Sequence, residues 1–520
     1  MSRRDFLLAG AATAAALTVQ GSAAPAAASE GPGLVQVGPD DPRYEHLRTR
    51  GNRRHTGRPD YLVVASTTGH VVTAVRRALQ EGRRVTVRSG GHCFEDFVDS
   101  PDIRVVIDLS TMTGVRFDED RRAFEVRAGT TLGELYRRLH LGWGVTLPGG
   151  SCPTVGAGGH VPGGGYGPLS RMHGLISDHL HAVEVVVADR DGRVEAVVAT
   201  REPGDPNREL WWAHTGGGGG GFGIVTRYWF RSVGARGDDP AMLLPRPPAS
   251  VLSFNVVWPW EGLTPQGFER LVGNFGGWCE RNSAAGSPGA ALYAELLLFR
   301  KQFGHHMMIG QVSGDDDALF ARFLAELGEE VGVTPEVRTE RLPWLTSAQL
   351  MPGGDDGRGQ RLKCASAYAR ERLGEQQVAA IHYHLVRDDL DHVGGILSLN
   401  THGAAVNSVE VGATATAHRD SVMKLFWLSS WEDVSFDERG TLWLREFYRD
   451  VYAATGGVPV REGAFINYAD SGLADPLWNR SGVEYGRIYF GANFDRLRRV
   501  KARFDPADVF RHGLSVGGGG

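Results

Sequence analysis

The stretch that decides the fold runs from residue 148 to residue 171 and reads Pro148-Gly-Gly-Ser-Cys-Pro-Thr-Val-Gly-Ala-Gly-Gly-His-Val-Pro-Gly-Gly-Gly-Tyr-Gly-Pro-Leu-Ser-Arg171. Glycine lets the backbone approach a ligand closely and adopt positive φ at little steric cost, so this run predicts a surface moulded to a ligand. Upstream lies a shorter turn of the same character, Arg88-Ser-Gly-Gly-His92. The longer run offers Cys152 and the shorter one a histidine, which predicts a large flat cofactor held at two points.

The composition is that of a soluble globular protein with an excess of glycine. The chain has 520 residues, of which 42% are hydrophobic and 22% are charged, and this length predicts two or three domains. Its 71 glycines are about twice the usual share of ~7%. The net charge of -5 argues against a nucleic-acid or anionic-membrane surface, because phosphate binding needs clustered Lys and Arg. The sequence therefore predicts a small-molecule partner.

The first thirty residues have the features of an export signal. Ser2-Arg-Arg-Asp-Phe-Leu-Leu8 has the order of a twin-arginine motif, and an apolar stretch and an alanine-rich segment follow it. The apolar stretch is too short to span a bilayer. We expect residues 1–30 to be removed and the rest to be secreted already folded, with its cofactor in place. A disordered alanine-rich leader is the alternative.

Periodicity divides the remaining chain into three parts. Short strands and helices alternate over residues 31–236, which predicts an α+β cofactor domain with ligand turns at the ends of strands. A linker rich in Gly, Asp, Pro and Arg leads into a second α+β domain, residues 237–457, in which helices are expected at 265–281, 315–327 and 374–386. Residues 458–520 are expected to return to the first domain.

Several common sites are excluded by their missing signatures. Gly156-Ala-Gly158 lacks the third glycine of a dinucleotide fingerprint, and the prolines at 153, 162 and 168 argue against a helix starting there. Motifs of nucleotide hydrolases, zinc proteases and α/β-hydrolases are absent. No metal site is expected, because His305-His306 and His382-Tyr-His384 fit alternating faces of secondary structure. The four scattered cysteines predict no disulfide framework, although one disulfide remains possible.

Several motifs together resemble the vanillyl-alcohol-oxidase (PCMH) type of FAD-linked oxidase. These are the two glycine segments quoted above and Leu210-Trp-Trp-Ala213 ahead of six glycines, in the family's order. The ending Tyr489-Phe-Gly-Ala-Asn493 resembles the berberine-bridge-enzyme C-terminal motif, and the whole likeness covers residues 43–516. It is closest to actinobacterial oxidases of antibiotic sugars, such as aclacinomycin oxidoreductase and glycopeptide hexose oxidases. The fold implied is α+β: an FAD-binding domain of two subdomains, and a substrate domain with an antiparallel sheet covered by helices.

The resemblance implies that FAD is bound bicovalently. His92 would bond the flavin 8α-methyl group and Cys152 would bond flavin C6, and imidazole and thiolate are nucleophiles suited to that attack. A structural histidine and an inert buried cysteine are the alternatives, and Cys93 is a competing thiol on sequence alone. The remaining residues carried over to the cofactor are Arg88, Ser89, Gly90, Gly91, Gly158, Gly159, His160, Gly164, Gly167, Gly223, Ile224, Val225 and Asn493.

For catalysis the resemblance implies a tyrosine base. Tyr468 matches the family's base, which needs a lowered pKa, and Tyr166 matches a tyrosine that hydrogen-bonds at the site. Amphipathic packing is the alternative for both. One departure concerns a second active-site tyrosine found in relatives after an Arg-Asp-Ser motif: here Trp427 stands in that place, and indole cannot act as a base. We therefore predict one oxidation per substrate visit.

The function implied is oxidation of a hydroxyl carbon on a sugar or glycosylated natural product, with O2 reduced to H2O2. The alternatives are a non-sugar alcohol, an oxidative cyclisation of a polyketide or alkaloid scaffold, a dehydrogenase with another acceptor, and a flavin-holding binding protein without turnover. Four tryptophans of the second domain could stack on a sugar, and the alternative is that they are core residues: Trp258, Trp344, Trp427 and Trp431.

Overall fold

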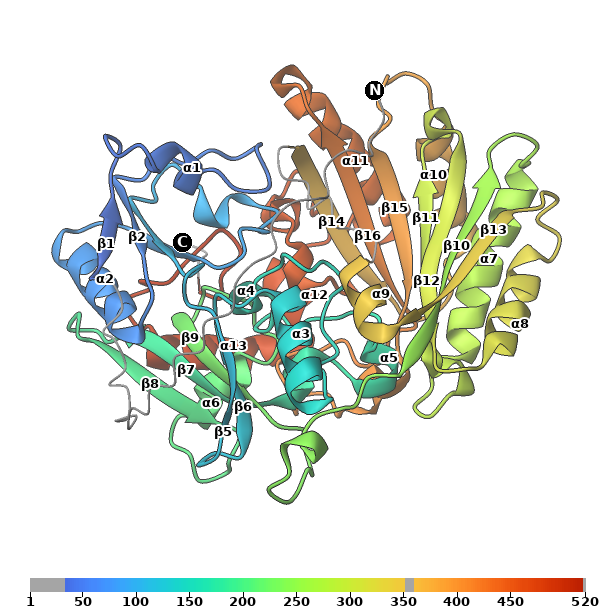
Figure 1. Cartoon of the computed structure of the whole chain (residues 1–520). Helices are drawn as coiled ribbons and strands as arrows, with labels where there is room; N and C mark the ends of the chain where they lie inside the picture. Colours follow the sequence, from blue (N-terminus) through green and yellow to red (C-terminus); the bar gives the residue numbers. More distant parts are fainter. Residues whose placement is uncertain (1–32, 351–359, 518–520) are drawn as a thin grey trace, which may run out of the picture. The chain divides into compact units, whose positions relative to one another are not determined.

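A computed structural model describes residues 33–350 and 360–517. The expected signal peptide, residues 1–30, lies outside the described residues. Two sheets of the cofactor part and one large sheet of the second part form the framework (Figure 1). In the described residues no helix is both long enough and apolar enough to cross a membrane.

The first sheet carries the histidine turn. Its order is β1-β2-β4-β3, with β2 and β3 parallel to β4 and β1 antiparallel to β2. The strands are β1 (Val35–Val37), β2 (Tyr61–Val64), β3 (Val85–Arg88) and β4 (Val105–Asp108). The helix α2 (Thr68–Gln80) begins where the Thr67 side chain accepts a hydrogen bond from the His70 backbone N–H, as an N-cap does. Because β3 ends at Arg88, the glycine turn and His92 follow directly.

The second sheet supports the glycine run. Its order is β5-β6-β9-β7-β8, and all of its pairs are antiparallel. The strands are β5 (Val115–Asp118), β6 (Ala123–Arg127), β7 (Leu180–Ala188), β8 (Val194–Thr200) and β9 (Ile224–Phe230). Every residue of β7 is buried, which matches its unbroken apolar sequence. The hairpins expected at 115–127 and 182–200 are confirmed.

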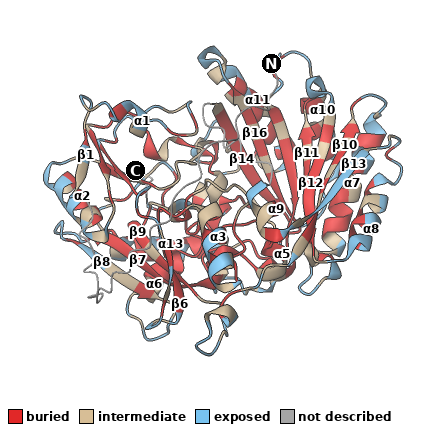
Figure 2. Ribbon diagram, in the orientation of Figure 1, coloured by how far each residue is buried: buried red, intermediate tan, exposed pale blue. Residues whose placement is uncertain are grey.

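The third sheet is antiparallel and has the order β13-β10-β12-β11-β15-β16-β14. Its strands are β10 (Ser250–Pro259), β11 (Leu292–Phe299), β12 (His305–Ser313), β13 (Glu336–Pro343), β14 (Arg361–Ala369), β15 (Gly395–Thr401) and β16 (Met423–Trp431). One face packs on a layer of helices: α7 (Pro265–Arg281), α8 (Asp317–Gly328), α10 (Glu375–Val386) and α11 (Asp437–Val451). The expected helices at 265–281, 315–327 and 374–386 are confirmed, two of them with small shifts at their ends. Figure 2 shows the buried strands of this sheet beside the exposed edge strand β13.

Shorter helices complete the fold around these sheets. They are α1 (Tyr44–Arg48), α3 (Leu132–Trp143), α4 (Ala157–His160), α5 (Ser170–His173), α6 (Arg208–Ala213), α9 (Trp344–Leu350), α12 (Tyr485–Phe490) and α13 (Phe494–Phe504). The expectation that prolines keep helix out of the glycine run was wrong. One helical turn, α4, fits between Pro153 and Pro162 because neither proline lies inside it.

Candidate active site

A cavity of about 480 Å³ lies between the cofactor sheets and the open face of the third sheet. It is lined by residues 86–94, which form the end of β3 and the turn that follows it, by parts of the run 150–160, by glycines 217–220, and by residues 465–469. Residues of β11, β14 and β16 complete the lining. The two segments predicted from their glycines to hold one cofactor therefore line one cavity.

The two predicted tether residues share one neighbour in this cavity. The Thr154 hydroxyl lies 3.0 Å from Nε2 of His92 and 3.4 Å from Sγ of Cys152. The other candidate thiol, Cys93, packs against the apolar cluster that contains Val37. Burial raises the pKa of the Cys93 thiol, which disfavours its nucleophilic thiolate form. All four cysteines are free of disulfides.

Most of the glycines carried over to the cofactor line the cavity. Gly90, Gly91, Gly158, Gly159 and Gly223 are among the lining residues. A Cβ built on Gly159 would meet no heavy atom within 4 Å, so a side chain there would occupy the cavity itself. Other predicted residues in the lining are Arg88, Ser89, His160 and Val225.

Four predicted cofactor residues lie outside the lining. Gly164 has φ of +103°, a conformation that favours glycine. Gly167 packs so closely on the Gly149 carbonyl oxygen that an added Cβ would be 1.8 Å away. The Asn493 amide donates to the backbone oxygens of residues 414 and 415, and Ile224 is buried in β9. These four residues therefore do not line the cavity, and their contact with a cofactor stays a prediction.

Tyr468 lies in the cavity wall beside a buried lysine. Nζ of Lys424 lies 3.4 Å from the Tyr468 hydroxyl and 4.5 Å from the centre of its ring. Burial raises the pKa of Tyr468 above its ordinary value, and the carboxylate of Glu295 adds to this increase. Burial also lowers the pKa of Lys424 to about 7. At neutral pH the tyrosine therefore keeps its proton, and a large share of Lys424 is neutral and able to accept one.

Tyr166 lies on the other side of the same lysine. Its ring centre is 4.4 Å from Nζ of Lys424, and its hydroxyl donates to the backbone oxygen of Thr401. Burial raises the pKa of Tyr166 as well. Because its hydroxyl is already engaged, Tyr166 positions Lys424 and the β15 backbone more readily than it accepts a proton.

Lys424 was not among the site residues predicted from the sequence, and Trp427 does not lie where it was predicted. Trp427 is fully buried on the opposite face of β16, with its ring 5.0 Å from Tyr448 of α11. The expectation that it stands at the active site is wrong, and the prediction of a single oxidation loses its basis. Period-2 alternation along 424–431 could have revealed two faces, but it does not say which face meets the cavity.

The remaining sugar-stacking candidates are core residues. Trp258, Trp344 and Trp431 are buried, and none of them lines the cavity. Among the residues that the structure describes, no group of three His, Cys, Asp or Glu side chains could hold a metal ion.

Comparison with known proteins identifies the family. The FAD binding domain family matches residues 59–197, and the family described as berberine and berberine like matches residues 464–517. Over 491 residues the chain is 50% identical to an aclacinomycin-N/aclacinomycin-A oxidase of Streptomyces galilaeus, which covers 93% of this chain and 90% of the relative. The chain belongs to the berberine-bridge-enzyme-like family of FAD-linked oxidases.

Further members of this family agree in sequence and fold. A hexose oxidase of Chondrus crispus is 30% identical over 537 residues, covering 92% of this chain and 93% of the relative. The crystal structure of a glycopeptide hexose oxidase complexed with teicoplanin is 43% identical, with a TM-score of 0.90 over 93% of this chain and 99% of that one. The predicted family and fold are confirmed, and the protein is an FAD-dependent oxidase of the aclacinomycin oxidase and hexose oxidase type.

The cavity of this berberine-bridge-like oxidase suits its cofactor. Glycine backbone lines the wall where a dinucleotide needs close approach, and the bare position Gly159 leaves the space that a side chain would fill. The candidate nucleophiles His92 and Cys152 line the same space. The residues present therefore fit FAD.

Proposed function

We propose that this protein is a secreted, bicovalent FAD oxidase that oxidises a hydroxyl carbon of a sugar or glycosylated metabolite and produces H2O2. The observation that carries the proposal is the contact between Tyr468 and Lys424 in the cavity that His92 and Cys152 also line. Secretion is supported by the arginine pair of the leader, residues 3 and 4.

Bicovalent attachment is supported by the contacts of Thr154. Its hydroxyl lies within 3.4 Å of both candidate nucleophiles, so the reactive atoms of His92 and Cys152 lie close to each other in the cavity. The 8α-methyl group and C6 lie on the same edge of the isoalloxazine ring, and two nucleophiles so close together match that spacing. The Thr154 hydroxyl is also placed to exchange a proton with either side chain.

When bound, FAD supplies the acceptor for the hydride and passes the electrons to oxygen. The side chains supply the path for the proton. Tyr468 hydrogen-bonds the substrate hydroxyl and receives its proton, while its own proton moves to neutral Lys424. This relay avoids a free tyrosinate, which the burial of Tyr468 disfavours. The aromatic rings of Phe94, Phe426 and Phe465 pack around Tyr468 and hold its ring in place.

A sugar substrate is supported by the polar floor of the cavity and by the relatives. Glu295 and Lys424 line the cavity, and Asn400 lies between them in the strand register. Hydroxyl groups need such donors and acceptors for orientation. The aclacinomycin oxidase and the two hexose oxidases are named for glycosylated or sugar substrates.

The test begins with the cofactor. The purified protein is precipitated with acid, the pellet is washed, and peptides containing His92 and Cys152 are examined by mass spectrometry for one shared flavin. A panel of mono- and oligosaccharides and glycosylated aromatic compounds is then assayed for H2O2. Flavin released by acid would overturn the bicovalent attachment. Substrate oxidation without an equal yield of H2O2 would favour a dehydrogenase with another acceptor, and turnover of non-sugar alcohols alone would overturn the sugar assignment.

A further inference from the structure

Glu295 is the acidic side chain in the cavity floor. It lies on β11, where its neighbour on β15 is Asn400 and its neighbour on β12 is Ile309. Asn400 in turn pairs with Lys424 on β16. Because directly paired residues share a face of the sheet, Glu295, Asn400 and Lys424 form one row on that face, and the two outer residues of the row line the cavity. Strand spacing puts the Cα atoms of Glu295 and Lys424 about 10 Å apart.

The present partners of Glu295 are neutral. The Tyr293 hydroxyl donates to its Oε1, and the Ser398 hydroxyl lies 3.5 Å from its Oε2. The Asn400 amide donates a hydrogen bond to Ser398 Oγ at 2.7 Å rather than to the Glu295 carboxylate. Within the described part of the chain, no basic side chain forms an ion pair with Glu295. What this carboxylate lacks is a positive charge rather than another hydroxyl donor.

The surrounding titratable groups do not supply that charge. Burial lowers the pKa of His160 to about 4 and that of His402 to about 3, so both are neutral at pH 7. Lys424 is two strands away and forms no ion pair with Glu295, although the carboxylate opposes the lowering of the lysine pKa by burial. The other titratable neighbours are tyrosines: Tyr166, Tyr293, Tyr368 and Tyr468. The Glu295 carboxylate is half-buried in the cavity wall and its hydrogen-bond partners are uncharged, so a cationic ligand in the cavity would form a charge-assisted hydrogen bond with it.

We propose that Glu295 binds an ammonium group of the substrate, so that the preferred substrates are amino sugars or glycosides that carry one. The inference rests on the proposed sugar oxidation. The reacting hydroxyl at Tyr468 lies at the Lys424 end of the row, because the two side chains are in contact, and the ammonium at Glu295 lies at the other end, with Asn400 between them. The ligand class is thus a pyranoside that carries an amino substituent apart from the hydroxyl that is oxidised.

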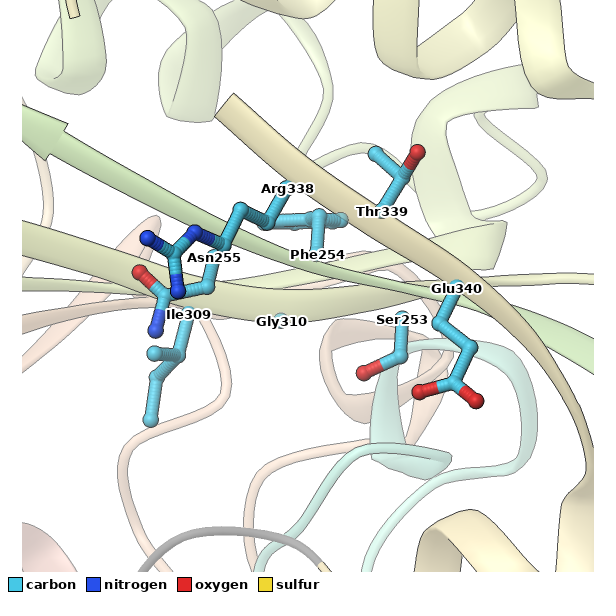
Figure 3. A pocket seen from close by; sticks show the side chains of 8 residues that line it. All are labelled: Ser253, Phe254, Asn255, Ile309, Gly310, Arg338, Thr339 and Glu340. Carbon is cyan, nitrogen blue, oxygen red and sulfur yellow. The ribbon is translucent and has the colours of Figure 1, made fainter. Parts of the chain in front are cut away.

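A second depression on the same sheet face provides the control residue. It is lined by residues of β10, β12 and β13, and Ile309 in its lining is the β12 neighbour of Glu295 (Figure 3). Figure 3 shows Glu340 beside Ser253 at one end of it, away from Ile309. Glu340 is exposed on the edge strand, so its carboxylate is solvated and needs no bound cation.

The experiment measures binding to the holoenzyme without turnover. Methyl hexopyranosides with one amino group, at carbon 2, 3 or 4, are titrated calorimetrically under anaerobic conditions at pH 7, each beside its hydroxyl parent. We expect at least one amino glycoside to bind at least tenfold more tightly than its parent. Glu295→Gln should reduce that preference to less than threefold, and Glu340→Gln should leave the preference intact.

The outcomes separate this inference from the function on which it rests. Visible flavin absorbance and the thermal midpoint of Glu295→Gln establish that the variant is folded and loaded. If glycosides are oxidised but no amino compound is preferred, or if Glu295→Gln keeps the preference, the ammonium site is wrong and the oxidase assignment stands. If none of the glycosides binds and none is oxidised, both are wrong.

Discussion

Tyr468 and Lys424 are more informative together than either is alone. Each side chain is disfavoured in its charged form by burial. A tyrosine and a lysine that are both neutral, with Nζ 3.4 Å from the hydroxyl oxygen, can nevertheless pass one proton along the pair. This arrangement gives the site a proton acceptor at neutral pH without a permanent buried charge.

The first prediction concerns the hydroxyl of Tyr468. Tyr468→Phe keeps the ring and its packing on Phe426 but removes the group that contacts the substrate proton. We expect kcat/KM to fall by about 10²–10⁴-fold, with the covalent flavin spectrum unchanged. Steady-state kinetics on the best substrate of the panel measure the loss. Turnover within tenfold of wild type would show that Tyr468 is not the proton acceptor.

The second prediction concerns pH. Lys424 accepts a proton only when it is neutral, and its pKa is lowered to about 7, so kcat/KM should rise with pH through about 7 and level off above it. Lys424→Met should lose most of the activity and also the rising limb. A pH series of kcat/KM for both proteins decides the matter. Persistence of the same limb in Lys424→Met would assign it to another group.

The glycine segments shape the cofactor wall through the space they leave. Gly159 belongs to the short helix α4, where its backbone does not need a positive φ. Gly159 matters because it has no side chain: it lines the cavity, and no atom lies within 4 Å of an added Cβ. A larger side chain would therefore fold but would occupy the cofactor's place.

The third prediction follows from this position. Gly159→Val should fold with a near-normal far-ultraviolet spectrum and incorporate little or no FAD, measured as visible absorbance per mole of purified protein. Gly273→Val is the matched control, because Gly273 in α7 also has no atom within 4 Å of an added Cβ and lies outside the cavity lining. Normal flavin content in Gly159→Val would contradict this view of the wall.

Three distant parts of the chain meet at one buried ion cluster. Lys363 of β14 contacts Glu95, which follows the His92 turn, and lies 2.6 Å from Asp470, which follows Tyr468. The backbone N–H of Ser471 also donates to Glu95. Burial alone would lower the pKa of Lys363, but Asp470 and Glu95 raise it, so the ammonium form is retained. The cluster therefore ties the segment after His92, the predicted flavin tether, to the segment after Tyr468, the proposed proton acceptor.

The fourth prediction tests this cluster. Lys363→Met leaves two buried carboxylates without their shared cation, and we expect the free energy of unfolding to fall by about 3–5 kcal/mol. Chemical denaturation monitored by tryptophan fluorescence measures the change. Lys301→Met, at an exposed lysine, should change stability by no more than about 0.5 kcal/mol. Adding Glu95→Gln to Lys363→Met should recover part of the loss, and equal stability of Lys363→Met and wild type would contradict the role of the cluster.

The family and its FAD cofactor could be predicted from the sequence, and so could three residues that the structure places in the cavity lining. His92, Cys152 and Tyr468 stand in short motifs, and the backbone freedom of glycine ties such motifs to a ligand surface wherever they occur. Local periodicity also predicted β3 and β11, whose residues line the cavity, but it did not predict α4 or β14. These features depend only on residues that are close together in the sequence, so they can be predicted without knowing the fold.

The side chains around Tyr468 could be identified only from the fold. Lys424, Asn400 and Glu295 lie on three strands and meet through strand register, and Trp427, three residues from Lys424, points to the opposite side. Alternation divides a strand into two faces but does not say which one covers the helices. Pairing across the sheet makes that choice, because it buries the larger apolar face against α11 and leaves the polar row in the cavity.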